Sequence, residues 1–572
     1  MILRKIFPFL VWVKGYTNQQ LKGDLSAGLT VGVMLIPQGM AYAMIAGLPP
    51  IYGLYSATLP LIIYALMGTS RQLAVGPVAM VSLLTASGIS TLVEQGTNAF
   101  IQYAIVLALM VGIIQFLLGL FKLGFLVNFL SHPVISGFTS AAALIIGISQ
   151  LQHLIGVKLP RSHHIHVILN EAFKALPDIN GLTLLIGLTG IALIIIMKKY
   201  FKSVPGQLVA VVFGILAVWG LGLTDYGVLI LGEVPKGLPQ MGVPIFNLEL
   251  IQDLFPIALA ISLVSFMESI AVAKAIQARH KNYKVIPNQE LISLGLANIG
   301  GSFFQSFPVT GGFSRTAVND QAGAKTGLAA IISAGLIILT LLFLTPLFYY
   351  LPKAILASVI MVAVFGLIDY KEAQHLWHSN KTDFAMLLAT FVATLSLGIE
   401  QGIGIGVILS LTLLIFKTTR PHIAILGKVP HSRFYRNTDR FDDLEVRPDV
   451  LILRFDAQLY FANINYFSSK IDEFVEQKGK GLKMIIINAE SINNMDSSAV
   501  KAVEDMVMEY RAQGIEFAFA SVKGPVRDAM SKAHLIEKIG ENHFFMSIQD
   551  AIDDYDQTTS QKFDGYTTQA NS

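Results

Sequence analysis

The chain of 572 residues is 53% hydrophobic and only 14% charged, with a mean hydropathy of +0.60. This composition excludes an ordinary soluble domain and predicts a membrane protein with many spans. Cysteine is absent, which excludes disulfides, thiol catalysis and cysteine-ligated metals. Residues 441–572 carry 13 Lys and Arg against 22 Asp and Glu, a net charge of −9, whereas the whole chain carries +3. A basic membrane part should therefore precede an acidic soluble part.

The membrane part is expected to span residues 24–430, after a basic cytoplasmic segment at residues 1–23. Two sets of about seven apolar stretches, in residues 24–235 and 250–430, approach the length that a bilayer requires. The expected segments lie near residues 24–47, 52–68, 73–93, 100–121, 124–152, 179–198, 205–222, 254–277, 287–303, 313–321, 324–348, 351–368, 381–399 and 401–417. With fourteen segments, the basic residues of the loops gather on one side, and the positive-inside rule places both termini in the cytoplasm.

The stretch from Pro308 to Asn319 interrupts this apolar pattern. It contains Gly311, Gly312 and the full charge of Arg315, which a lipid-facing helix could not carry without cost. The proline and the glycine pair predict a broken helix, followed by a short helix that starts near Ser314. The unpaired N–H groups and positive dipole end of that helix, next to a guanidinium, should attract an anion. The alternative is a re-entrant loop that only caps a helix bundle.

Two halves with an odd number of spans insert in opposite senses, as in transporters that have inverted repeats and a site at the membrane midplane. This arrangement requires a counterpart of the Arg315 stretch in the first half. Residues 72–75 have an extended pattern, Gly76 and Pro77 break the backbone, and a short apolar helix follows from Val78. Two helix N-termini are therefore expected to face each other with the anion between them.

Three groups of motifs carry a family resemblance. The first is GDLSAGLTVGVMLIPQGMAYA at residues 23–43, continued by AGLPP and YGLY up to Tyr55. The second is GTSR at residues 68–71 with VGP at 75–77, and the third is the Arg315 stretch continued by AGAKT at 322–326. Together they resemble the signature of the sulfate permease (SulP) family, whose animal branch includes prestin and pendrin. The resemblance covers nearly the whole chain.

The resemblance implies fourteen segments in two inverted repeats of seven, a core domain that moves against a gate domain, and a homodimer. In that family the anion lies between the third and tenth segments and touches the first. The matching substrate-binding positions of this sequence are Gln38, Tyr42, Val78, Ala79, Phe313, Ser314 and Arg315. Simple helix packing is the alternative role of Tyr42 and Phe313. Some animal relatives have an aromatic residue at the Val78 position, so the pocket of this chain is expected to be wider.

Glu268 places a carboxylate within the apolar eighth segment, where a charge is expensive and by default functional. Ser262, Ser265 and Ser269 are expected on the same helical face, at three- and four-residue spacing. We interpret Glu268 as the residue that takes up and releases a coupling proton. A fixed ion pair with Arg315, or with a cation at the end of a segment, is the alternative. In the family that the chain resembles, a glutamate at this place suggests proton symport, and an aspartate is found in sodium-bicarbonate relatives.

The soluble part is expected to be an α/β STAS domain at residues 440–556. Strands are expected at residues 450–455, 483–487 and 517–520, and amphipathic helices at 463–477, 497–513 and 524–533. The polar residues 557–572 are expected to form a disordered tail.

One loop of this domain carries a regulatory hypothesis. The run from Asn494 to Ala499 resembles the STAS loop of anti-sigma factor antagonists, in which the serine after the aspartate can be phosphorylated. Here these residues are Asp496 and Ser497. The alternative is that one of them only caps the following helix.

The sequence as a whole predicts a secondary active anion transporter, most simply a proton-coupled sulfate symporter with an elevator-type motion, in a plasma membrane such as a bacterial inner membrane. A sodium-coupled bicarbonate or dicarboxylate symporter, an anion exchanger and a chloride-conducting channel are alternatives. An enzyme is not expected, since there is no nucleotide-binding glycine loop or catalytic triad. The expected partners are the anion, a proton, membrane lipid, a second copy of the chain and a cytosolic protein at the STAS domain. No cofactor, metal or nucleic acid is expected.

Overall fold

The computed structural model describes residues 7–125, 131–157, 159, 165–201, 205–245, 247–280 and 283–569. The chain divides into two compact units, Met1–Ser410 and Leu411–Ser572. The first unit is almost entirely helical, and the second contains a six-stranded sheet.

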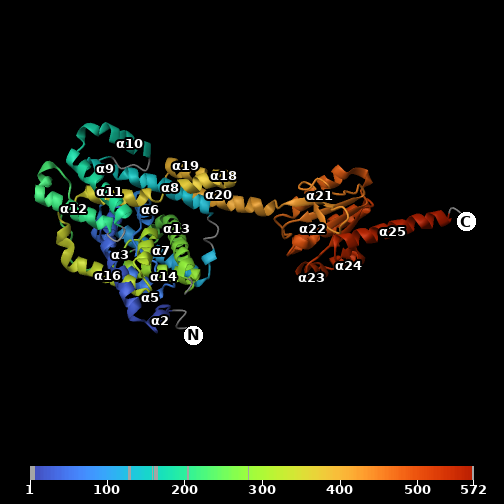
Figure 1. The fold of residues 1–572 in the computed structure, drawn as a ribbon, viewed down its shortest axis with the longest axis horizontal. Helices are drawn as coiled ribbons and strands as arrows, with labels where there is room; N and C mark the ends of the chain where they lie inside the picture. Colours follow the sequence, from blue (N-terminus) through green and yellow to red (C-terminus); the bar gives the residue numbers. More distant parts are fainter. Residues whose placement is uncertain are drawn as a thin grey trace. The chain divides into compact units, whose positions relative to one another are not determined.

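The first half of the helical unit consists of short and long apolar helices with one short strand (Figure 1). Its elements are α2 (Phe9–Val13), α3 (Asn18–Ile45), α4 (Ile51–Tyr55), α5 (Leu59–Met67), β1 (Val75–Gly76), α6 (Ala79–Ser90), α7 (Asn98–Leu120), α8 (His132–Ser149), α9 (Leu151–Ile155), α10 (Ile165–Lys174), α11 (Gly181–Tyr200) and α12 (Gly206–Leu221).

The second half has a similar composition of elements. They are α13 (Leu248–His280), α14 (Pro287–Ser302), β2 (Thr310–Gly311), α15 (Phe313–Gln321), α16 (Leu328–Leu339), α17 (Lys353–Phe365), α18 (Tyr370–Ser379) and α19 (Lys381–Leu397), and α20 (Ile399–Thr419) leads into the second unit. A π-helical turn (Thr340–Leu344) and a 3-10 turn (Thr345–Phe348) extend α16.

Each of the fourteen stretches expected from the sequence overlaps a helix. Within the described residues, seven helices or helix runs are long and apolar enough to cross a membrane, and four further apolar helices are shorter. The fold is therefore that of a helical membrane protein, as predicted, and the number of fourteen crossings stays a prediction.

Helices from the two halves pack directly against each other, α7 against α14 and α3 against α16. The α7–α14 contact brings backbone against backbone. A Cβ atom at Gly112 would lie 2.6 Å from the nitrogen of Ile299, and one at Gly295 would lie 2.6 Å from the nitrogen of Phe116. Because no side chain fits at either position, the two glycines allow this close approach between the halves.

The second unit has the strand order β4-β3-β5-β6-β7-β8, in which β5 to β8 are parallel and β3 and β4 antiparallel. Its strands are β3 (Ile423–Lys428), β4 (Tyr435–Asn437), β5 (Val450–Phe455), β6 (Met484–Asn488), β7 (Glu516–Ala520) and β8 (Phe544–Phe545). Its helices are α21 (Ile464–Lys478), α22 (Ser497–Ala512), α23 (Gly524–Lys532), α24 (Leu535–Ile539) and α25 (Ile548–Gln569).

The three strands and three helices expected in this unit are confirmed within one or two residues. The sheet also contains β3, which begins before residue 430 and pairs with β5. Its apolar residues closely follow those of α20, so the sequence analysis assigned them to the membrane part at residues 24–430. The helix α25 continues to Gln569, through most of the segment for which the sequence predicts a disordered tail.

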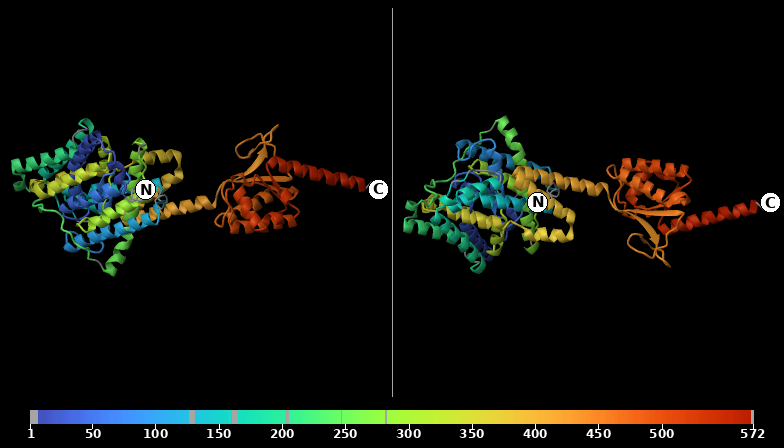
Figure 2. Two further views of the ribbon diagram at one scale, coloured as in Figure 1. Left: turned by 90° about the horizontal axis from the view of Figure 1, so that it is seen from below. Right: turned by 90° about the horizontal axis from the view of Figure 1, so that it is seen from above.

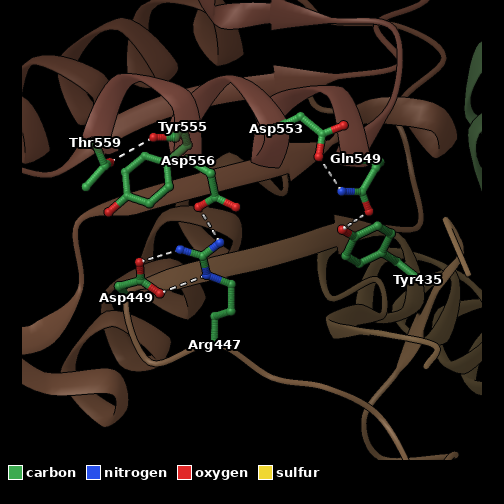
Figure 3. Close-up of polar contacts among 8 residues, drawn as sticks. All are labelled: Tyr435, Arg447, Asp449, Gln549, Asp553, Tyr555, Asp556 and Thr559. Atoms are coloured by element: carbon green, nitrogen blue, oxygen red, sulfur yellow. Dashed lines mark hydrogen bonds and ion pairs between the residues drawn. The ribbon is translucent and has the colours of Figure 1, made fainter. Parts of the chain in front are cut away.

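Two apolar clusters cover the two faces of the sheet. The helices α21, α22, α23 and α24 lie on one face of the sheet and α25 lies on the other (Figure 2), and their apolar side chains form the two clusters. A polar cluster fixes α25 at its third turn (Figure 3). There, Nη1 of Arg447 donates to Asp556 at 2.6 Å, while Nε and Nη2 of Arg447 donate to the two carboxylate oxygens of Asp449 at 3.0 and 2.7 Å. These bonds connect the helix to the residues that precede β5.

Candidate functional site

The two broken segments predicted from the sequence lie side by side. The strands β1 and β2 pair antiparallel, with Val75 opposite Gly311 and Gly76 opposite Thr310. A short helix follows each strand. α6 begins at Ala79, with two residues between it and β1, and α15 begins at Phe313, after the single residue Gly312. The sequence predicted a short helix near Ser314, and α15 confirms it.

Both short helices begin without a side-chain cap. Val78 and Gly312 occupy the N-cap positions in extended conformations, and neither supplies a side-chain hydrogen bond to the first turn. The first N–H groups of an α-helix have no partner within the helix itself. These N–H groups and the positive ends of the two helix dipoles can therefore hold an anion.

Arg315 is buried between these helix starts, with 1% of its surface exposed. Its Nη1 donates to the carbonyl oxygen of Pro77 at 2.6 Å, whereas Nε and Nη2 are buried and have no hydrogen-bond partner among the described residues. A Cβ atom at Gly312 would lie 2.9 Å from Nη2, so the guanidinium occupies the space that a larger residue would need. A buried charged donor without a partner is costly, and a bound anion would remove that cost.

Side chains of α15 hold the extended segment of the first half in place. The backbone N–H of Ala74 donates to Oγ1 of Thr316 at 3.0 Å, and the carbonyl of Ala74 accepts from Gly312 N at 3.0 Å. Nδ2 of Asn319 donates to the carbonyl of Gln72 at 2.8 Å. All of these groups are buried, so the pairing of the two broken segments is rigidly supported.

The serines of α13 serve this scaffold and not Glu268. Thr310 Oγ1 donates to the carbonyl of Ser265 at 2.7 Å, and Ser269 Oγ accepts from Gly311 N at 2.9 Å. Ser262 Oγ donates to its own helix, to the carbonyl of Ala258 at 2.6 Å. All three serines are buried on α13, and their hydroxyl groups bind β2, the helix backbone and Gln115. That they share one helical face stays a prediction.

Glu268 instead lines a cavity of about 240 Å³. Its Oε2 atom is buried and has no hydrogen-bond partner, and no ion pair within 4 Å joins it to Arg315 in the described part of the chain. Electrostatic interactions nevertheless connect Glu268, Arg315 and Tyr42. The fixed ion pair considered from the sequence is therefore absent here, and the carboxylate has no structural partner that would explain it.

The remaining predicted site residues surround the same region. Gln38 and Tyr42 lie one turn apart on α3, which packs against both α6 and α15. The side chains of both are buried, and Oε1 of Gln38 has no partner. Phe313 is 58% exposed and lines the Glu268 cavity, and Ser314 is exposed beside it. Their roles in binding stay predictions.

Asp24, the first residue of the first expected membrane segment, is not the N-cap of that helix. Thr17 caps α3, and Asp24 lies buried within the helix. Its carboxylate accepts hydrogen bonds from Tyr16 Oη at 2.8 Å, from the N–H groups of Lys325 and Thr326 at 2.6 and 2.9 Å, and from Thr326 Oγ1 at 2.5 Å. Asp24 therefore attaches the loop after α15 to helix α3.

Glu290 forms a matching attachment that the sequence analysis missed. This buried carboxylate of α14 accepts from Tyr64 Oη at 2.5 Å, from the N–H groups of Thr69 and Ser70 at 2.7 and 3.2 Å, and from Thr69 Oγ1 at 2.5 Å. Both carboxylates thus accept from a tyrosine, a threonine and two consecutive N–H groups. The available signal was a carboxylate in the first turn of the expected segment at residues 287–303.

In the soluble unit, Asp496 is the N-cap of α22. Its Oδ1 accepts from Ala499 N at 2.8 Å, and its Oδ2 accepts from Phe461 N at 2.9 Å. This is the capping role considered from the sequence. Ser497 is exposed in the first turn of α22, where a modifying enzyme could reach it.

Comparison with known proteins connects both units to described families. Residues 21–390 match the Sulfate permease family, and residues 443–551 match the STAS domain. The chain is 39% identical over 563 residues to a probable sulfate transporter 4.2 of Arabidopsis thaliana, across 96% of this chain and 83% of the relative.

Solved structures agree with this assignment. The inward-facing structure of the murine Slc26a9 anion transporter superposes with a TM-score of 0.89 at 26% identity, over 96% of this chain and 94% of that one. The transmembrane domain of a cyanobacterial bicarbonate transporter superposes with a TM-score of 0.59 at 25% identity, over 69% of this chain and 98% of that one.

Proposed function

Because the chain belongs to the sulfate permease family, a family of membrane transporters and not of enzymes, we propose that it is a secondary active transporter that carries sulfate together with a proton. The observation that carries this proposal is the buried guanidinium of Arg315 between the starts of α6 and α15, with two nitrogen atoms that have no partner. The sulfate transporters to which the chain is similar support sulfate as the anion.

Proton coupling follows from the position of Glu268. A sulfate dianion beside the Arg315 guanidinium would lie within electrostatic range of the Glu268 carboxylate, and the two negative charges would repel each other. The site therefore binds the dianion and a proton together. When both leave, the charges of the Glu268 carboxylate and the Arg315 guanidinium balance each other. The empty site then carries no net charge and can return to the side of the membrane where it binds the anion.

The proposed movement is of the elevator type. The helices α3, α6, α13 and α15 carry the proposed site residues. In this movement they would shift as one body past other helices of the first unit, which form the gate domain. In this proposal, the protein is a multi-pass homodimer with both termini in the cytoplasm, and the STAS domain binds a cytosolic protein. Phosphorylation of Ser497 would be one way to regulate that contact.

A sodium-coupled bicarbonate symporter or an anion exchanger is the second candidate, favoured by the similarity to the bicarbonate transporter domain. Helix N-termini and one arginine bind bicarbonate, a dicarboxylate or chloride by the same physics. Dependence of uptake on a sodium gradient would distinguish this candidate. A chloride-conducting channel has no need of the buried cation that Arg315 provides.

The decisive experiment measures uptake of labelled sulfate into proteoliposomes with an imposed inward proton gradient. The parent protein should accumulate sulfate above equilibrium, and Glu268→Gln should only equilibrate it or fail. Glu249→Gln, an exposed residue at the start of α13, is the matched control and should behave like the parent. Uptake of bicarbonate but not of sulfate under any gradient would refute the substrate assignment and the proton role together.

A further inference from the structure

Among the described residues that line the Glu268 cavity there is one other titratable side chain, His132 of α8. The rest of the lining is apolar or uncharged. It consists of Met80, Val134, Ile135, Phe138, Thr139, Val264, Met267, Ala271, Val272, Phe313 and Leu367. A proton on Glu268 therefore has a single protein group within this cavity to which it can pass.

A carboxylate orients the His132 ring. Nδ1 of His132 lies 3.2 Å from Oε1 of Glu372 on α18, and the two side chains are 72% and 23% exposed. A neutral imidazole that donates its Nδ1–H to this carboxylate has its lone pair on Nε2, which can then accept a proton. Glu372 also stabilises the imidazolium that would result.

The two titratable groups differ in their access to water. Oε2 of Glu268 is buried without a partner, whereas most of the His132 side chain is exposed. A buried acid exchanges its proton with bulk water slowly unless an accessible group receives it. His132 shares the cavity with that acid and also contacts solvent.

We propose that His132, oriented by Glu372, passes the coupling proton between Glu268 and the solvent at the open side of the cavity. This inference rests on the proposed function, since it assumes that Glu268 carries a proton. In release, the O–H bond of the Glu268 carboxylic acid breaks and an N–H bond forms at Nε2, directly or through one water. The imidazolium then gives one proton to bulk water and returns to the neutral form, and loading is the reverse.

Other elements around His132 present no competing charge. The α6 and α15 residues of the cavity are Met80 and Phe313. The neighbouring α20 contributes Ser410, whose hydroxyl accepts from Ser131 N at 3.0 Å, and α19 packs on α8 through residues such as Leu387. Among the residues that the structure describes, Glu372 contacts His132 and Glu268 lies across the same cavity.

The test uses proteoliposomes of the full-length protein and two readouts. A trapped fluorescent pH indicator reports the proton flux that a sulfate gradient drives, and exchange of labelled for unlabelled sulfate at equal pH on both sides reports anion movement alone. His132→Asn, which can still donate to Glu372 but cannot carry a proton, should slow the proton flux at least about ten-fold. Its sulfate exchange should stay within about two-fold of the parent, because the substitution affects only the proton step.

Two further variants sharpen the result. Glu372→Gln keeps an acceptor but removes the charge, and should slow the proton flux less than His132→Asn does. His378→Asn, on α18 but not in the cavity lining, is the control and should match the parent. An unchanged proton flux in His132→Asn, or an equal loss of flux and sulfate exchange, would overturn the relay. Absence of any sulfate-driven proton flux in the parent would instead refute the proposed coupling itself.

Discussion

Nη1 of Arg315 donates a hydrogen bond to the carbonyl oxygen of Pro77 at 2.6 Å, across 238 residues of sequence. This bond connects the cation of the second half to the helix break of the first half. It uses one of the guanidinium donors and leaves Nε and Nη2 for another acceptor. The geometry thus assigns one nitrogen to the scaffold and two to the proposed anion.

Replacing Arg315 should therefore separate the effect of its charge on sulfate binding from the effect of its planar hydrogen-bond geometry. Arg315→Lys keeps the charge but cannot serve both Pro77 and an anion through a planar fork, so KM for sulfate should rise about 10- to 100-fold. Arg315→Ala should abolish saturable uptake. Initial rates of sulfate uptake over a range of concentrations measure both effects. Arg433→Lys, which is exposed in the soluble unit, should leave KM unchanged. An unchanged KM in Arg315→Lys would contradict the assignment.

Glu290 should stabilise the fold without taking part in transport. Glu290→Gln places an amide N–H₂ group among four hydrogen-bond donors, and the loss of the buried acceptor should cost about 3 kcal/mol or more. The apparent Tm of the detergent-solubilised protein should fall by several degrees, whereas Glu249→Gln should leave it unchanged. A Tm equal to that of the parent would show that the four bonds contribute little.

Asp496 should contribute stability to the soluble unit through its cap. Asp496→Ala removes the acceptor for Ala499 N and should destabilise α22 by about 1 kcal/mol. Ser497→Ala leaves the hydrogen bond of the Asp496 cap in place and should leave thermal unfolding unchanged. Comparison of the unfolding transitions of the full-length variants measures the difference. If Ser497→Ala were the more destabilising change, the capping role of Asp496 would be refuted.

The contact between Arg447 and Asp449 should make the attachment of α25 sensitive to acid. The hydrogen bonds from Arg447 hold the pKa of Asp449 below its usual value. The stabilisation is therefore fully present above the usual aspartate pKa near 4 and is lost as the pH falls through the lower folded-state pKa.

The corresponding variant is Asp449→Asn. Because both side chains are partly exposed, the free energy of unfolding of the parent should exceed that of this variant by only about 0.5–1 kcal/mol at pH 7, and the difference should decrease as the pH falls below the usual aspartate pKa near 4. Thermal unfolding of the two proteins at neutral pH and at pH values below that pKa measures it. A difference that grows toward acid would have the wrong sign for this mechanism.

The sequence predicted the helix breaks because proline and glycine pairs interrupt an apolar run whatever the tertiary structure. It also predicted β5, β6 and β7, whose apolar residues form continuous short runs. Capping by Asp496 was likewise readable, since the residue directly precedes an amphipathic helix. In each of these cases the signal lies within a few residues of the chain.

Contacts between distant residues could not be predicted in this way. The pairing of β1 with β2 involves two residues on each side, too few for a strand pattern. Asp24 has the local appearance of a cap, and only the tertiary structure shows the loop that it binds. His132 has no distinguishing neighbour in sequence, because the Glu372 that orients it lies on another helix.

The pairing of β1 with β2 also has a consequence for biosynthesis. While the ribosome adds the residues between Gly76 and Thr310, the first half is in the membrane with an unpaired backbone edge and no acceptor for its Ala74 N–H group. A nascent chain arrested before Thr310 would expose these polar groups permanently. Such truncated products should be recognised by membrane proteases, and co-expression of the missing half as a separate chain should protect them.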